Sequence, residues 1–154
     1  MEDLGVERVH GRPIRLLQLA EWAWEEPTRA GQFTLLVAAT ALVDDAPLVR
    51  RFAADAVASG CAYVCTWGQG CEHVHHLFDE ASIGADRFVM STSHADESLA
   101  EALYFALVDA LPEEVSDSTA SAAILAVEQP WIPEVRRLVS DQEELARLWV
   151  AEGE

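Results

Sequence analysis

Four short apolar runs alternate with amphipathic stretches from residue 33 onward. The runs have the length and composition of buried strands, and the stretches between them space apolar residues three or four positions apart, as helices do. The predicted strands are 33–43, 61–67, 87–93 and 120–127. The predicted helices are 44–60, 71–81, one that Asp96 or Ser98 opens and Pro112 closes, and a last one after Pro130 and Pro133.

The alternation of strands and helices predicts a three-layer α/β domain. We expect a mostly parallel sheet of four to five strands with helices on both faces. A chain of 154 residues can bury a core of its own, so residues 13–154 should form this single domain, with a mobile segment at 1–12. The segment 13–26 follows neither the strand period nor the helix period, and we expect an edge strand or a short helix there.

The chain is strongly acidic. It carries 27 acidic residues against 10 basic ones, a formal net charge of −17, and all ten basic residues are Arg. Nucleic-acid binding needs clustered basic side chains, so the composition disfavours it. The acidity either keeps the protein in solution or serves a basic partner protein. The absence of Lys, together with many Ala, is typical of the coding bias of a GC-rich bacterium, and a surface selected to lack Lys is the other interpretation.

We expect no targeting segment in this sequence. Its start, MEDLGVERVHGRP, lacks the basic region and apolar core of a signal peptide, and no apolar run approaches the ~20 residues of a membrane span. We therefore expect a cytoplasmic protein without membrane association. Three cysteines in that compartment should be free thiols, metal ligands or core residues.

Polar residues follow the predicted strands where open parallel sheets bind ligands, outside the carboxyl ends of the strands. The ligand-binding candidates there are Asp44, Asp45, Trp67, Gly68 and Gly70. The glycines of the WGQG turn would let the backbone approach an anion at the next helix, and a tight turn without a ligand is the other interpretation. The dinucleotide fingerprint is incomplete, because His73 occupies its third glycine position, and a chain without Lys has no Walker motif.

Cys71, His94 and Glu97 are candidate catalytic residues. Cys71 stands at the start of a predicted helix, where the helix dipole lowers the pKa of a thiol. If the second and third predicted strands are neighbours, His94 approaches it as a base, with Glu97 or Asp96 orienting the imidazole. The other interpretation is a helix-capping thiol and a loop histidine, because no catalytic cysteine signature is present.

The same region offers a candidate zinc site. Cys71 and His75 are four residues apart on one side of the predicted helix, and Cys65 and His94 would complete a Cys₂His₂ set. The paired C-x₂-C spacing of zinc ribbons is absent. Free thiols without any cofactor are therefore the other interpretation.

Two neighbouring side chains are expected to be structural. His76 should form a solvated pair with Glu72 one helical turn away. Cys61 should be a core residue that shares one strand face with Tyr63, Cys65 and Trp67, because alternate residues of a strand face the same way.

Two stretches, VCTWGQGCEHVHHLFDE (64–80) and MSTSHADESLAEALYFAL (90–107), resemble the hallmarks of an uncharacterised family of bacterial proteins. In that family a Cys, a Trp-Gly pair, a second Cys and a His follow one strand, and another His precedes an acidic helix start. The matching positions are Cys65, Trp67, Gly68, Cys71, His75 and His94 with Glu97. The resemblance implies no activity, but it directs attention to this cluster.

Two functions are compatible with these features. The first is a small regulatory or interaction protein, such as an immunity or inhibitory partner, and the charge, the size and the lack of a complete catalytic motif favour it. The second is an enzyme or small-ligand binder that uses Cys65, Cys71, His94 and Glu97 in hydrolysis or in acyl or thiol transfer. We expect Trp22, Trp24, Trp131 and Trp149 to pack in the core; exposed in one patch, they would indicate a homo-oligomer or partner interface.

Overall fold

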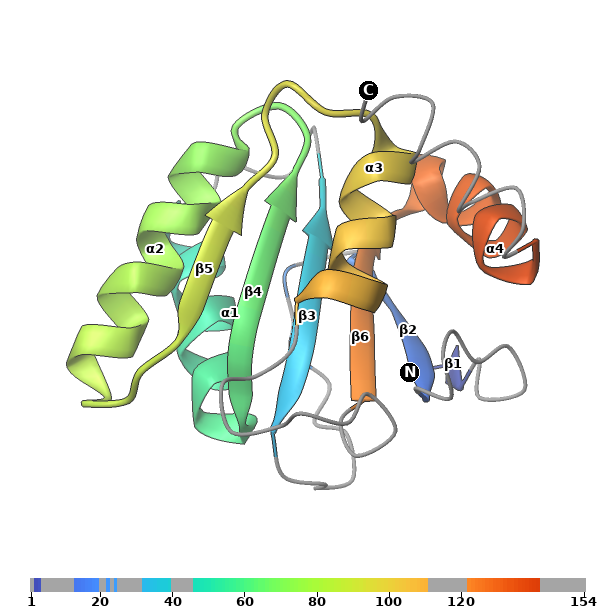
Figure 1. Ribbon diagram of the computed structural model, residues 1–154. Coiled ribbons are helices and arrows are strands. Elements are labelled where there is room, and N and C mark those ends of the chain that lie inside the picture. Colours follow the sequence, from blue (N-terminus) through green and yellow to red (C-terminus); the bar gives the residue numbers. More distant parts are fainter. Residues whose placement is uncertain are drawn as a thin grey trace.

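The protein is built around one twisted sheet, seen face-on in Figure 1. The computed structural model describes residues 2–3, 13–19, 22, 24, 32–39, 46–110 and 122–141. The strands lie in the order β1-β2-β6-β3-β4-β5; β1 is antiparallel to β2, and the other five are parallel. Their bounds are Glu2–Asp3 (β1), Ile14–Leu19 (β2), Phe33–Ala38 (β3), Cys61–Trp67 (β4), Met90–Ser93 (β5) and Ala122–Glu128 (β6).

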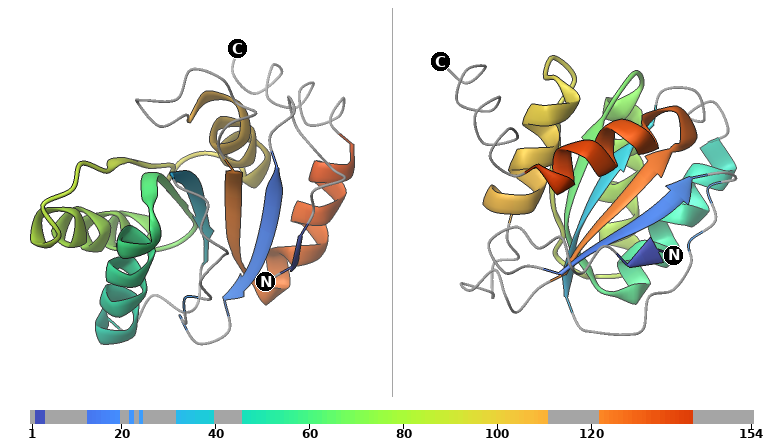
Figure 2. Two further views of the ribbon diagram at one scale, coloured as in Figure 1. Left: turned by 90° about the horizontal axis from the view of Figure 1, so that it is seen from below. Right: turned by 90° about the vertical axis from the view of Figure 1, so that its right-hand side faces the viewer.

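Helices cover both faces of the sheet, as the view from below in Figure 2 shows. Helices α1 (Ala46–Ser59) and α2 (Cys71–Gly84) lie on one face. On the other lie α3 (Leu99–Tyr104), the π-helical turn Phe105–Asp109 that continues it, and α4 (Ile132–Ser140), which a 3₁₀ turn (Gln129–Trp131) precedes. Each face has its own buried apolar cluster, so the predicted three-layer α/β fold is confirmed.

The predicted boundaries are closest where glycines mark the ends of an apolar run. Strand β4 has the predicted bounds, and α2 begins at the predicted residue but continues to Gly84. The run at 33–43 is a strand only as far as Ala38, and residues 40–45 lie outside the described part of the chain. The run at 87–93 pairs as a strand only from Met90.

The ambiguous segment 13–26 contains the strand β2, which lies between β1 and β6. Ile14 and Leu16 belong to the cluster under α3 and α4, whereas Leu17 and Leu19 belong to the cluster under α1 and α2. Both faces of β2 are covered, so its sequence lacks the apolar–polar alternation of a half-exposed strand. Glu2 and Asp3, from the segment expected to be mobile, form β1, and the rest of residues 1–12 lie outside the described part.

A β-bulge corrects the expected facing of Cys61. Phe33 pairs with Cys61 and Thr34 with Tyr63, so β4 carries one extra residue, Ala62, opposite β3. Cys61 therefore joins the cluster under α1 and α2, while Tyr63 and Cys65 face α3. Cys61 is a core residue as expected, and burial raises the pKa of its thiol.

None of the described helices is long and apolar enough to cross a lipid bilayer. Three of the four tryptophans considered above pack inward: Trp22 is buried, both Trp22 and Trp24 contact the ring of Phe52 edge-on, and Trp131 packs against the cluster under α3 and α4. Trp149 lies outside the described residues.

Candidate functional site

The carboxyl ends of β4 and β5 lie side by side, which was the condition for a site shared by Cys71 and His94. The two strands pair in parallel from Tyr63↔Met90 to Thr66↔Ser93. The backbone N–H of His94 donates to the carbonyl of Thr66 over 2.8 Å, which ties the loop after β5 to the end of β4. The segments 68–70 and 94–98 therefore line the same edge of the sheet.

A pocket of about 330 Å³ lies between these two segments. It is lined by Gly68, Gln69, Gly70, Cys71, Glu72, Ala95 and Asp96. Gly68 and Gly70 have φ of 110° and 82°, a backbone conformation that favours glycine and brings the chain back into α2. Two of the expected ligand-binding residues thus line this pocket, while Asp44 and Asp45 lie outside the described part.

The charge of the pocket differs from that of an anion site. Glu72 and Asp96 line it, and Glu97 follows directly. The helix α2 presents roughly half a positive charge at its N-terminus, which two full carboxylate charges outweigh. The pocket therefore favours a positively charged ligand, although its turn has the form of an anion-binding one.

Cys71 lines this pocket but is buried, with 3% of its surface exposed. Burial is the main influence on its thiol and raises the pKa, while hydrogen bonds from the backbone of His94 and the side chain of Thr66 lower it less. The expected lowering of this pKa by the helix dipole is therefore wrong.

His94 and Glu97 form the expected pair. The other side of the imidazole contacts the hydroxyl of Thr92 and not the thiol of Cys71, which was expected there. Nδ1 of His94 lies 2.7 Å from Oε2 of Glu97, and Nε2 lies 2.8 Å from Oγ1 of Thr92. Glu97 can only accept, so Nδ1 carries the proton and Nε2 accepts from the Thr92 hydroxyl. The ring is buried against Phe105, at 4.9 Å between ring centres. The pair of His94 and Glu97 is thus positioned to act on the hydroxyl of Thr92 and not on the thiol of Cys71.

A second cavity, of about 560 Å³, lies between Trp67 and the 3₁₀ turn before α4. Trp67 and Trp131 meet edge-on there at 5.0 Å between ring centres. The indole N–H of Trp67 donates to the carbonyl of Glu97 over 2.8 Å. The indole N–H of Trp131 is buried and has no hydrogen-bond partner among the described residues. Trp67, expected to bind a ligand beside Gly68, thus faces a different cavity.

The structure does not bring the four expected zinc ligands together. No three of Cys65, Cys71, His75 and His94 place their ligand atoms within 4.8 Å of one another. Cys65 is fully buried in the cluster under α3, whereas His75 projects from α2 on the opposite face.

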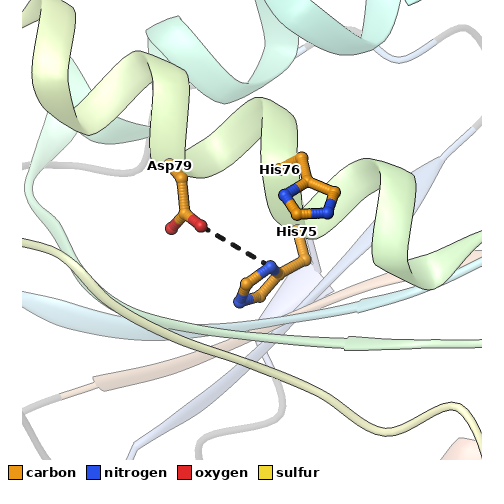
Figure 3. Close-up of side chains that lie close together, drawn as sticks. All are labelled: His75, His76 and Asp79. Carbon is orange, nitrogen blue, oxygen red and sulfur yellow. Dashed lines mark ion pairs between the residues drawn. The ribbon is translucent and has the colours of Figure 1, made fainter.

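Across the described residues, the group that meets this distance criterion is His75, His76 and Asp79 (Figure 3). His76, expected to pair with Glu72, lies beside His75 at 5.6 Å between ring centres. The sequence held one signal for this group, the four-residue spacing of His75 and Asp79, which places both side chains on one side of a helix.

The fold and this edge define a three-layer α/β domain with an acidic pocket at the carboxyl ends of its central strands. Residues 14–142 match a domain of unknown function, DUF7684, and the chain belongs to this family. The match agrees with the resemblance to an uncharacterised family that the two central stretches carry. No curated protein and no solved structure matches the chain.

Proposed function

We propose that this protein is a small regulatory or interaction protein that holds a positively charged group of a basic partner protein at the carboxyl edge of its sheet. The observation that carries the proposal is the pocket between residues 68–72 and Ala95–Asp96, where Glu72 and Asp96 line a cavity of about 330 Å³. That volume is at the lower end of the range for ligand sites, about 300–1,000 Å³, and suits one side chain of a partner.

The net charge of −17 supports the same partner class through its long-range field. A strongly acidic protein attracts a basic one from a distance and raises the rate of association, more so at low salt. Individual exposed ion pairs contribute only about 0–1 kcal/mol. An arginine side chain gains more, because its planar guanidinium can donate two parallel hydrogen bonds to one carboxylate.

The experiment is a titration of the full chain with an arginine-rich peptide at two salt concentrations, followed by calorimetry and by amide chemical shifts. Removing charge without changing shape, in the double variant Glu72→Gln/Asp96→Asn, should weaken binding by about ten-fold. The matched control Asp55→Asn/Asp86→Asn removes the same charge from exposed positions away from the pocket and should leave most of the affinity intact.

Shifts confined to residues 68–72 and 94–97 would support the pocket. Equal weakening by both double variants, with shifts spread over the surface, would show attraction by net charge alone and would contradict the proposed site.

A second candidate function is acyl transfer or hydrolysis, which the Thr92–His94–Glu97 geometry favours. The hydroxyl, imidazole and carboxylate are joined by contacts of 2.8 and 2.7 Å, in the order of nucleophile, base and orienting group. In such a reaction Thr92 Oγ1 attacks a carbonyl carbon, Nε2 of His94 takes the hydroxyl proton, and the leaving group departs with the bonding electron pair.

The test is incubation with an activated ester, followed by mass spectrometry of the peptides. An acyl group on Thr92, lost in Glu97→Gln, would support this function. The absence of an adduct on Thr92 after exhaustive incubation would exclude it and leave the network a structural one.

A further inference from the structure

A second histidine cluster lies on the other face of β5, apart from the acidic pocket. His75, His76 and Asp79 of α2 place one ligand atom each within 4.8 Å of one another (Figure 3). Nδ1 of His75 lies 3.6 Å from Oδ2 of Asp79. Ser91 of β5 completes the group, with its Oγ 2.9 Å from Nε2 of His75 and 2.7 Å from Oδ1 of Asp79.

The hydrogen bonds of Ser91 orient the ligand atoms of this cluster. Its hydroxyl donates to Oδ1 of Asp79, because a carboxylate can only accept. The same oxygen can then accept from Nε2 of His75, which lies 2.9 Å away. Nδ1 of His75 and Oδ2 of Asp79 face each other at 3.6 Å, so a cation held between them would contact both atoms.

The spacing suits a metal ion. The 3.6 Å between Nδ1 of His75 and Oδ2 of Asp79 is longer than a direct hydrogen bond, which is about 2.9 Å. Two ligands at about 2.0–2.2 Å from a tetrahedral zinc ion are separated by about 3.4 Å. His76 adds a third donor on the same side, and Asp79 and His75 remain 42% and 23% exposed, so an ion can reach them from solvent.

We propose that His75, His76 and Asp79 bind a divalent transition-metal ion of the zinc type. Two imidazoles and one carboxylate suit Zn²⁺, Co²⁺ or Ni²⁺ better than Mg²⁺ or Ca²⁺, which prefer oxygen ligands alone. Ser91 is a positioning residue: it accepts from the far nitrogen of His75 and donates to the far oxygen of Asp79, which orients both ligands. Three protein ligands leave a fourth position open to water. The site is independent of the acidic pocket.

The test is a Zn²⁺ titration of the full chain after removal of bound metal by a chelator, with Co²⁺ as a spectroscopic probe. His76→Ala changes an exposed residue and should not disturb folding; it should weaken the affinity by about ten-fold or more, as should Asp79→Asn. The matched control is His73→Ala, an exposed histidine of the same helix outside the cluster, and its affinity should equal that of the unmodified chain.

The Co²⁺ spectrum separates this site from a cysteine site. Nitrogen and oxygen ligands give visible bands without the near-ultraviolet charge-transfer band of a cobalt thiolate. A thiolate band would assign the metal to the cysteines and overturn the proposal. So would Zn²⁺ binding weaker than about millimolar, or an equal loss of affinity in His73→Ala and His76→Ala.

Discussion

Ser91 and Thr92 are consecutive residues of β5, and their hydroxyl groups hydrogen-bond to histidines on opposite faces of the sheet. Ser91 meets His75 over 2.9 Å, and Thr92 meets His94 over 2.8 Å. The alternation of side chains along a strand alone separates the two contacts. The contact of Ser91 belongs to the cluster of His75, His76 and Asp79, whereas the contact of Thr92 belongs to the pair of His94 and Glu97.

Replacing Thr92 by Val should destabilise the protein by about 1–3 kcal/mol. The change removes the hydroxyl proton that reaches the buried Nε2 of His94 while keeping the shape of the side chain. Thr92→Ser keeps the hydroxyl and should retain most of the stability. Urea denaturation of the three proteins measures the difference, and equal stability of the Val and Ser variants would contradict it.

Substitutions of Trp67 and Trp131 should differ in their effect on stability, although the two rings are in contact. Trp67→Phe leaves the carbonyl of Glu97 without its hydrogen-bond donor. This substitution should lower the free energy of unfolding by about 1 kcal/mol more than Trp131→Phe does. The latter removes a buried N–H that has no described partner, which partly offsets the lost packing. Thermal denaturation of both variants is the measurement. A larger loss for Trp131→Phe would indicate a contact that its N–H makes elsewhere.

Ser98→Ala should cost about 1 kcal/mol. Ser98 caps α3 in a capping box with Glu101: its hydroxyl accepts from the N–H of Glu101, whose carboxylate in turn accepts from the N–H of Ser98. Ser140→Ala is the control, because that exposed hydroxyl bonds a carbonyl within its own helix and should contribute little. Chemical denaturation should separate the two variants; an equal loss would show that the cap contributes nothing.

Stability should fall as the pH rises above 9. Burial raises the pKa of the Cys61 and Cys71 thiols above their unfolded value of 9.0, so the folded state holds these protons longer than the unfolded state does. The stabilisation is complete below pH 9 and is lost as the pH rises; for the fully buried thiol of Cys61 the loss is about 1.4 kcal/mol per pH unit above pH 9.

The measurement is the free energy of unfolding between pH 8 and 10.5, compared with that of Cys61→Ala, whose curve should fall less steeply. Cys71 should also react with iodoacetamide at neutral pH more slowly than a free thiol does. Rapid alkylation of Cys71 below pH 8 would contradict the direction of its pKa shift.

The fold could be predicted wherever the local pattern and the tertiary environment agree. Strand β4 is an apolar run closed by glycines, and α2 follows from the spacing of Val74, Leu77 and Phe78, which are all buried. The pairing of His94 with Glu97 also followed from sequence, because the two residues are three apart in one loop.

The rest depended on registers that no local pattern encodes. Ser91 reaches His75 because β5 pairs with β4 under α2, and the extra residue at Ala62 turns Cys61 to the other face. The pKa of Cys71 was predicted in the wrong direction because a helix start is visible in the sequence, whereas the depth of burial is not.

The π-helical turn after α3 bears on how this chain tolerates changes of length. The N–H of Ala110 donates to the carbonyl of Phe105, five residues back, over 2.8 Å, so the turn holds one residue more than an α-helix needs. Deleting one residue of the turn would remove this extra residue and restore ordinary helix geometry, while the residues on either side keep their facing. Leu107 is fully buried and Phe105 lies against the ring of His94, so the loss of either would cost core packing, whereas Val108 is only partly buried. In related chains, a one-residue gap in an alignment should therefore fall within this turn, at a position such as 108.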